Sequence, residues 1–518
     1  MASANGMASV HRFWRRFRRR SPLVQVASVA VVLVVVGGGV YAVGSHPSSS
    51  PRRDTGTTPS TGAPGLGGAS STSTPRASTG GPSSVTTAST SSRGVTTSSI
   101  NVVFPVVSLN SLAGQEGFAQ DAEFGEQTKA IKLFVEQIND TGGINGRRIN
   151  PIIVNFDPTN EASMRALCKE WTEGSPAVFA VLDGLGDWTG DNELCVTQEG
   201  HTPFVGAWTT VTNWTDLGSP YLWWTGTDQA AILQAVVDWG LNAGLIGPGI
   251  KVGIIAGNRA SDQVALNDYL LPELRKAGIT PMVRSIDANP DDTAATDSAS
   301  PLVIQQFRSA GVTSVIPLVP INVLFPVLAA ETTQQYFPKL LLSDYEESIE
   351  TTLGLLPLDA KALDGQEGLT TETLGGIDSP RPESQGGYNP GVRSCWVLWH
   401  KTYPEVPPGN MNDFIEEQGP IAGWCQVIDL FATAAKSAGR DLDRRTFVTA
   451  MSKITDFPGT WSTDLSFGPD KRYGPTQYQV VKLRLNSPPS PLCKTTPGKP
   501  PPGTCWVSVL PFAPLPTG

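Results

Sequence analysis

The chain has 518 residues, enough for two or three domains of ordinary size, and carries 47 acidic against 38 basic side chains. Ten of the basic residues but only one of the acidic residues precede residue 100, so the remainder holds 28 basic and 46 acidic side chains, a formal charge of −18. Such an acidic body repels nucleic acids and anionic membrane surfaces, which argues against nucleic acid as a partner.

The N-terminal segment has the pattern of a membrane-targeting element. Residues 1–22 form a basic stub with six arginines, and residues 23–44 contain no charged side chain. A helix of about 21 residues spans roughly 30 Å, the thickness of a bilayer core. The basic stub predicts a cytoplasmic N-terminus, so we expect a single-pass membrane anchor with the body outside the cytoplasm. Cleavage near the small residues at 42–44 is the alternative, and it would give a secreted protein.

Residues 45–99 consist almost entirely of Ser, Thr, Pro, Gly and Ala. This composition offers no apolar periodicity from which a core could form. We therefore predict a disordered stalk between the membrane and the body.

The body begins with apolar runs of strand length that alternate with amphipathic helical patterns. Strands are expected at 100–107, 149–156, 177–183 and 202–207, with helices at 124–138 and 162–171. The same alternation then recurs, with strands at 251–257, 282–286, 314–318 and 339–343 and helices at 262–277 and 302–310. Apolar strands that alternate with helices predict parallel sheets covered on both faces, and two such units predict an α/β protein with two lobes.

The C-terminal part has a different pattern. Residues 352–392 are rich in Gly, Pro and acidic side chains and are expected to be loop, and helices are expected at 392–403 and 421–438. Two strands at 478–485 and 506–510 are expected to form a hairpin.

All six cysteines lie in the expected exported body, and they are Cys168, Cys195, Cys395, Cys425, Cys493 and Cys505. An even number in an oxidising compartment indicates three disulfides, and the spacing favours pairing in sequential order among the 15 possible connectivities. The chain has no CxxC motif and its body has only two histidines, His201 and His400. We therefore predict neither a metal site nor a cofactor.

One stretch is specific enough to suggest a family. Residues 134–157 (FVEQINDTGGINGRRINPIIVNFD) closely resemble the opening of the type I periplasmic binding proteins that serve branched-chain amino acid importers, the leucine-isoleucine-valine-binding-protein-like solute receptors. The shared pattern is a helix ending in Asn, then Gly-Gly-Ile-x-Gly-Arg, a strand and an Asp. Residues 251–257 and 305–318 resemble the same family, and the resemblance covers about 100–485 in the right order. Members also carry an early disulfide at about the spacing of Cys168 and Cys195.

The resemblance implies two Rossmann-like lobes with parallel sheets, joined by a hinge that the chain crosses three times. Lobe one would hold residues 100–222 and 366–455, and lobe two would hold 228–350 and 456–511. Each expected disulfide then lies within one lobe and leaves the hinge free to close.

Ligands of open parallel sheets bind outside the carboxyl ends of the strands. The residues at these ends that we assign to the ligand site, most of them by their position in the family pattern, are Gly186, Asp187, Trp188, Ala207, Trp208, Thr209, Ser261, Asp262, Asp344, Tyr345 and Glu346. Two departures stand out: the first loop lacks the family's Ser and holds an Asp, and Ser261-Asp262 replaces a usual Tyr-Gly pair. An acidic cleft favours a cationic or polyhydroxylated ligand. The alternative is structural: the acids cap turns or helices, and the tryptophans pack in the core or at the hinge.

No catalytic motif for a nucleophilic serine, a phosphate loop or a zinc protease is present, and we predict that the protein is not an enzyme. A glycosidase-like carboxylate pair, such as Asp183 with Glu346, is the weaker alternative. The resemblance implies a solute receptor that closes on a small polar ligand, such as an amino acid or amide, and delivers it to an ABC permease. The absence of a lipid-anchoring cysteine and the altered site residues leave open a second role, a membrane-anchored sensory or partner-binding ectodomain.

Overall fold

The computed structural model describes twelve segments of the chain, namely residues 92–107, 124–156, 161–183, 191–207, 212–288, 293–345, 362–372, 390–404, 411–460, 462, 464–484 and 505–516. The predicted anchor and all but the last residues of the predicted stalk lie outside these segments. Within them, no helix combines the length and the apolar character needed to cross a membrane.

The first sheet has five strands, all parallel, in the spatial order β2-β1-β3-β4-β5. The strands are β1 (Ser99–Val107), β2 (Arg148–Phe156), β3 (Ala180–Asp183), β4 (Phe204–Gly206) and β5 (Leu222–Trp224). The central strands are mostly apolar because helices cover both faces of the sheet.

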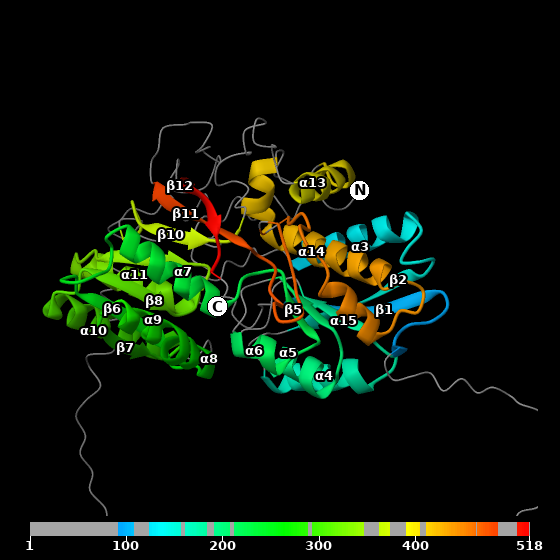
Figure 1. Cartoon of the computed structure of the whole chain (residues 1–518), viewed down its shortest axis with the longest axis horizontal. Helices are drawn as coiled ribbons and strands as arrows, with labels where there is room; N and C mark the ends of the chain where they lie inside the picture. The colour runs from blue at the N-terminus through cyan, green and yellow to red at the C-terminus, as the bar shows by residue number, and fades with distance from the viewer. Residues whose placement is uncertain are drawn as a thin grey trace, which may run out of the picture. The chain divides into compact units, whose positions relative to one another are not determined.

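The helices of the first sheet fall into two groups. One face is covered by α3 (Phe124–Asp140), α13 (Pro390–Thr402), α14 (Met411–Ser437) and α15 (Arg444–Met451). The opposite face is covered by α4 (Glu161–Glu173), α5 (Asp191–Leu194), the π-helical turn η3 (Cys195–Glu199) and the flanking α6 (Thr212–Leu217). Helices α3 and α14 lie side by side, although almost 300 residues separate them in the chain (Figure 1).

The second sheet has seven strands in the order β12-β11-β10-β9-β8-β6-β7. The strands are β6 (Val252–Gly257), β7 (Met282–Ile286), β8 (Ser314–Leu318), β9 (Lys339–Ser343), β10 (Glu367–Thr370), β11 (Gln477–Arg484) and β12 (Cys505–Pro514). Strands β6 to β10 pair in parallel, whereas β11 pairs antiparallel with both β10 and β12.

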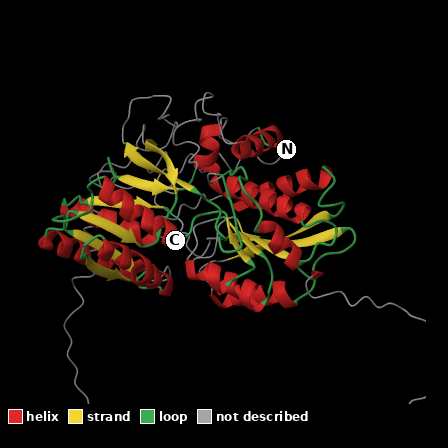
Figure 2. Cartoon of the chain, viewed as in Figure 1, coloured by secondary structure: helices red, strands yellow, loops and turns green. Residues whose placement is uncertain are grey.

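Helices also cover both faces of the second sheet, as the red and yellow ribbons show (Figure 2). One face packs against α7 (Gln229–Asn242), α8 (Ala260–Val264), the π-helical turn η4 (Ala265–Leu270) and α9 (Leu271–Lys276), and the other against α10 (Thr293–Ala310) and α11 (Ile321–Gln334). Two helix-covered, mainly parallel sheets confirm the α/β architecture expected from the alternating pattern.

Some predicted elements differ from the structure. The helix predicted at 262–277 is helical from Ala260 to Lys276, but its middle, Ala265–Leu270, is a π-helical turn, and Pro272 lies in the first turn of the segment that follows. The prediction that residues 352–392 are loop was wrong at two places, because this segment contains strand β10 and α13 already begins at Pro390. Strand β10 was missed because its sequence, EGLT, has a single large apolar side chain, although it is mostly buried between β9 and β11.

In the described segments the chain passes three times between the helices and strands of the two sheets. The three passages run through Thr225, through Glu372 and through the segment between α15 and β11, which contains Ser462. The division proposed between the lobes differs slightly from these contacts: β10, which follows position 366, pairs in the seven-stranded sheet, and Leu465 and Phe467 pack in the core of the five-stranded sheet.

Two of the three expected disulfides lie in the described residues, and both are confirmed. Cys168 and Cys195 join α4 to η3, and Cys395 and Cys425 join α13 to α14. Cys493 lies outside the described residues, so the pairing of Cys493 with Cys505 stays a prediction. Each observed disulfide connects helices that cover the same sheet.

Candidate functional site

Five of the predicted ligand-site residues lie in the described part of the chain: Ala207, Ser261, Asp262, Asp344 and Tyr345. The other six lie outside the described residues, and they are Gly186, Asp187, Trp188, Trp208, Thr209 and Glu346. The described five lie at or just beyond the carboxyl ends of strands β4, β6 and β9, the expected edge of each sheet.

Asp262 lies in α8 and Tyr345 lies just after β9, and the structure brings the two side chains together. The Tyr345 hydroxyl donates a hydrogen bond of 2.7 Å to Oδ1 of Asp262, and both side chains are buried. Arg259 binds the same carboxylate through two nitrogens, with Nε 2.8 Å from Oδ2 and Nη2 2.7 Å from Oδ1. Gly257 makes room for this carboxylate, because a Cβ there would lie 2.0 Å from Oδ2.

The arrangement around Asp262 changes the charge expected at this part of the site. A carboxylate held by both arms of a guanidinium is neutralised and has little hydrogen-bonding capacity left for a cationic ligand. The Arg259 side chain keeps about a quarter of its surface exposed, at 26 %, whereas Asp262 has none. Sequence reasoning selected Asp262 and missed Arg259, although the spacing of three residues at the start of a helix was visible in the sequence.

Asp344 is fully buried at the end of β9 and binds the chain segment that follows β10. Its Oδ2 accepts hydrogen bonds of 2.7 Å from both the backbone N–H and the hydroxyl of Thr371. Burial raises the pKa of Asp344 from 3.8 to about 6, against the opposing effect of the hydrogen bonds from Thr371 and Thr370. In this conformation Asp344 therefore joins β9 to the chain that leaves β10.

Ala207 is buried, and its carbonyl oxygen accepts a hydrogen bond of 3.2 Å from the Thr225 hydroxyl. Thr225 is the first residue after β5, where the chain leaves the first sheet. The carbonyl of Ala207 thus links the predicted ligand edge to the first passage between the sheets.

Ser261, the remaining described residue of the predicted ligand site, is only partly exposed.

The three passages meet in a group of buried polar side chains that sequence reasoning did not find. We call Thr225, Glu372, Gln426, Thr460 and Ser462 the crossover cluster. The Oε1 atom of Gln426 accepts from the backbone N–H of Thr460 at 2.7 Å and of Ser462 at 3.2 Å. The Ser462 hydroxyl donates to the carbonyl of Thr225 at 2.8 Å, and its backbone pairs with Glu372. One amide side chain therefore holds the third passage, which in turn holds the first and second.

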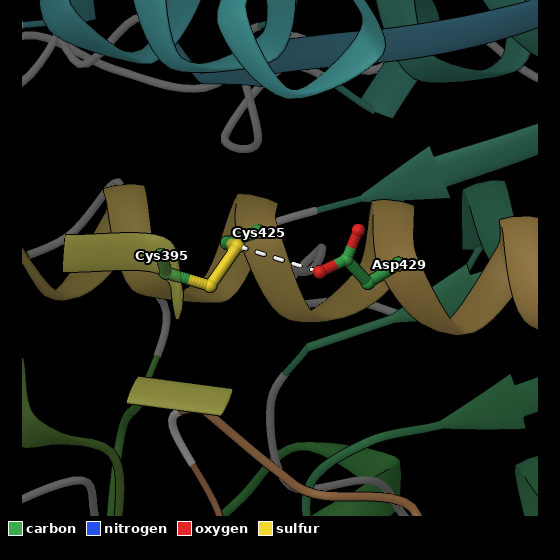
Figure 3. A group of neighbouring side chains, drawn as sticks. All are labelled: Cys395, Cys425 and Asp429. Atoms are coloured by element: carbon green, nitrogen blue, oxygen red, sulfur yellow. Dashed lines mark hydrogen bonds between the residues drawn. A yellow bond between two sulfur atoms is a disulfide. The ribbon is translucent and has the colours of Figure 1, made fainter. Parts of the chain in front are cut away.

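The Cys395–Cys425 disulfide lies directly beside the crossover cluster. Cys425 immediately precedes Gln426, and Sγ of Cys395 lies 3.2 Å from the Thr460 hydroxyl. Figure 3 shows Asp429 one turn further along the same helix, with a carboxylate oxygen 3.8 Å from Sγ of Cys425. Burial raises the pKa of Asp429 from 3.8 to about 6.

Cys395, Cys425 and Asp429 also bring three potential metal-ligating atoms within 4.8 Å of one another. The two sulfurs are joined in a disulfide, so neither can supply the thiolate that a metal requires. In this oxidised form the disulfide joins α13 to α14 directly beside the crossover cluster.

Lys471 organises the loop that continues from the third passage. Its ammonium group lies 2.7 Å from the carbonyl oxygen of Ser466, 2.6 Å from that of Tyr473, 3.0 Å from that of Gly474 and 3.1 Å from that of Pro475. Burial lowers the pKa of Lys471 from 10.5 to about 7, and the nearby Asp228 opposes this shift. The loop also extends the first sheet, because Trp224 of β5 donates its N–H to the Arg472 carbonyl at 2.8 Å.

Replacement of Lys471 by Met should lower the free energy of unfolding by about 2 kcal/mol, because the carbonyls around the ammonium group lose their donor. Chemical denaturation of the wild type and the variant measures the difference. The matched control is Lys251→Met, since Lys251 is exposed and donates to one carbonyl only, that of Ala310. Equal losses for the two variants would contradict a structural role for the four carbonyls.

Two helix-covered, mainly parallel sheets connected by three passages define the type I periplasmic-binding fold. The chain belongs to the periplasmic binding protein family, whose model matches residues 112–371. That family is made of solute-binding proteins that act outside the cytoplasm.

Solved structures of the same fold support this assignment. A fatty acid ABC transporter substrate-binding protein from Thermomonospora curvata is 18 % identical, with a TM-score of 0.55 over 81 % of this chain and 93 % of that one. A solute-binding protein from Rhodopseudomonas palustris BisB5 in complex with 3,4-dihydroxy benzoic acid is 14 % identical, with a TM-score of 0.55 over 81 % and 98 %. A branched-chain amino acid ABC transporter protein from Thermus thermophilus with bound valine is 14 % identical, with a TM-score of 0.53 over 80 % and 96 %. No curated protein matches the chain.

Proposed function

We propose that the protein is an extracytoplasmic solute receptor that captures a small carboxylate-bearing ligand by hinge closure and delivers it to an ABC importer. The observation that carries the proposal is the crossover cluster, in which a single buried amide holds the passages between the two sheets. Such a small connecting region is suited to hinge bending, in which a ligand stabilises the closed form through contacts with both lobes.

The charge around Asp262 supports a carboxylate ligand. The sequence alone favoured a cationic or polyhydroxylated ligand because acids follow strands β6 and β9. Arg259 neutralises Asp262, and Asp344 is buried against Thr371, so neither described acid offers a free charge to a cation. The similar structures named above concern a fatty acid, 3,4-dihydroxy benzoic acid and valine, and each of these compounds has a carboxyl group. An amino acid or an aromatic acid is the ligand class we favour.

The proposal places the body outside the cytoplasm. The basic stub 1–22 and the uncharged run 23–44 support a membrane anchor, and the composition of 45–99 supports a stalk that holds the body away from the bilayer. The division into lobe one (100–222 and 366–455) and lobe two (228–350 and 456–511) is part of this proposal, with β10 counted in lobe two and Leu465 and Phe467 counted in lobe one.

The ligand is identified by a thermal-shift screen of the full chain in non-ionic detergent micelles, against amino acids, aromatic acids, fatty acids, polyamines and sugars. A ligand at a hundredfold its dissociation constant stabilises the folded state by about 2.7 kcal/mol, which raises the melting temperature measurably. We expect stabilisation by a carboxylate. The double variant Arg259→Gln with Asp262→Asn, which keeps the local charge balanced, should abolish it, and Arg284→Gln, at a partly exposed position of the edge strand β7, should not.

Other outcomes of the screen separate the alternatives. Stabilisation by polyamines alone would contradict the proposed carboxylate ligand and would support the cationic ligand expected from the sequence. A folded protein that responds to no compound would contradict solute import and favour the sensory or partner-binding ectodomain.

A further inference from the structure

The base of the five-stranded sheet contains a buried arginine that no acid among the described residues neutralises. Arg444, the first residue of α15, is only 5 % exposed. Its Nη2 donates to the Val178 carbonyl at 2.8 Å, and its Nη1 lies 3.1 Å from the His201 carbonyl and 3.3 Å from that of Gly200. These carbonyls precede strands β3 and β4, so the guanidinium lies at the amino ends of the strands, opposite the proposed ligand edge.

A second arginine lies beside it. The guanidinium of Arg93 donates through Nη2 to the carbonyl of Gly174, four residues before Val178 in the turn that connects α4 to β3. Burial and, to a lesser degree, the positive charge of Arg93 together lower the pKa of Arg444 from 12.5 to about 10. The turn between α4 and β3 therefore binds two cations that repel each other.

Neither cation has a carboxylate partner in the described part of the chain. The ion pairs found there involve other residues. The Nε atoms of Arg93 and Arg444 are both buried and make no hydrogen bond. A buried charge without a counter-charge costs several kcal/mol, and proteins normally pair such groups. Two adjacent guanidinium groups with unused donors therefore lack an anion.

The rim of this region offers two further donors. The ring of Tyr221 packs against the imidazole of His201, with centroids 5.9 Å apart, and the backbone carbonyl of His201 accepts from Arg444. His201 is exposed, and Arg93 and Tyr221 are partly exposed, so the region is open to solvent from this side.

We propose that Arg93 and Arg444, with Tyr221 and His201 at the rim, form an oxyanion site that binds a phosphate group. Guanidinium forks match the geometry of phosphate oxygens, and two of them balance the charge of a phosphate dianion better than that of a single carboxylate. The group can come from free phosphate or from the headgroup of a lipid. Arg93 belongs to the C-terminal end of the predicted stalk, which connects this end of the body to the proposed anchor.

Isothermal titration of the full chain in non-ionic micelles with inorganic phosphate tests the site, at constant ionic strength set by chloride. We expect binding by the wild type, and at least a tenfold weaker apparent Kd for Arg93→Gln, because a charge-assisted hydrogen bond and one positive charge are lost. Arg93 is partly exposed and binds one described carbonyl, so this variant should fold. The control Arg308→Gln removes an exposed arginine that also binds one carbonyl, that of Gln334, and should bind phosphate like the wild type.

A second titration, with glycerol 3-phosphate, distinguishes the two sources. Tighter binding of glycerol 3-phosphate than of inorganic phosphate assigns the site to a lipid headgroup, and the reverse assigns it to free phosphate. The variant Arg444→Lys keeps the buried charge but loses the fork, and we expect it to weaken both ligands while the protein stays folded. Absence of binding by the wild type, or equal binding by wild type and Arg93→Gln, would overturn the site.

Discussion

Replacement of Gln426 by Leu should lower the free energy of unfolding by about 4 kcal/mol. The side chain is fully buried, and its Oε1 atom accepts hydrogen bonds from the backbone N–H groups of Thr460 and Ser462. Leucine has a similar size but no acceptor, so both donors would be left buried and unpaired at a cost of about 1–3 kcal/mol each. Because Ser462 also holds the carbonyl of Thr225, we expect the variant to loosen the first passage as well.

Urea denaturation of the full chain in micelles measures this effect, followed by tryptophan fluorescence, because Trp223 and Trp224 of the first sheet and Trp239 of α7 on the second sheet are buried. The matched control is Gln334→Leu, since Gln334 makes one exposed hydrogen bond to the Pro301 carbonyl and should change stability by less than about 0.5 kcal/mol. A loss of similar size in both variants would show that Gln426 does not hold the crossover cluster. An unchanged midpoint for Gln426→Leu would exclude the cluster as the connection between the passages.

The sheets could be predicted because their strands are continuous apolar runs, such as 251–257, bounded by helical patterns. That pattern follows from burial on both faces, which requires no knowledge of the rest of the chain. Strand β10 could not be found in this way. Its four residues are held in the sheet by the backbone of β9 and β11, and β11 lies more than 100 residues further along the chain.

The site was less predictable than the fold for a related reason. Position in the family pattern selected Asp262 and Tyr345, and the structure does bring their side chains together. Their charge state depends on partners that position alone does not reveal, namely Arg259 for Asp262 and Thr371 for Asp344. Gln426 left only a faint signal, a single amide within the otherwise apolar stretch 421–428 of α14, and its partners come from distant passages of the chain.

The free energy of unfolding should fall between pH 4 and pH 8, and replacement of Asp344 by Asn should make this fall smaller by about 2 to 3 kcal/mol. The folded state holds the Asp344 proton more tightly than the unfolded state, because burial raises the pKa from 3.8 to about 6. The stability linked to this proton is therefore fully present below about pH 4 and is lost as the pH rises through 6. The rise in the pKa from 3.8 to about 6 corresponds to about 3 kcal/mol of folding free energy. Asparagine does not ionise, so the Asp344→Asn variant does not lose this part of its stability as the pH rises.

The difference between the pH dependence of the wild type and that of Asp344→Asn separates the contribution of Asp344 from that of the other buried acids. Burial also raises the pKa of Asp429 and of Glu331, so the wild type should lose stability with rising pH for three reasons. The amide oxygen of asparagine can still accept both hydrogen bonds from Thr371, so the difference between the two curves reports the charge at position 344. Asp268→Asn on the exposed side of η4 is the control, and its curve should run parallel to that of the wild type. A parallel curve for Asp344→Asn would mean that this carboxylate reaches solvent, and it would then be free to contact a ligand.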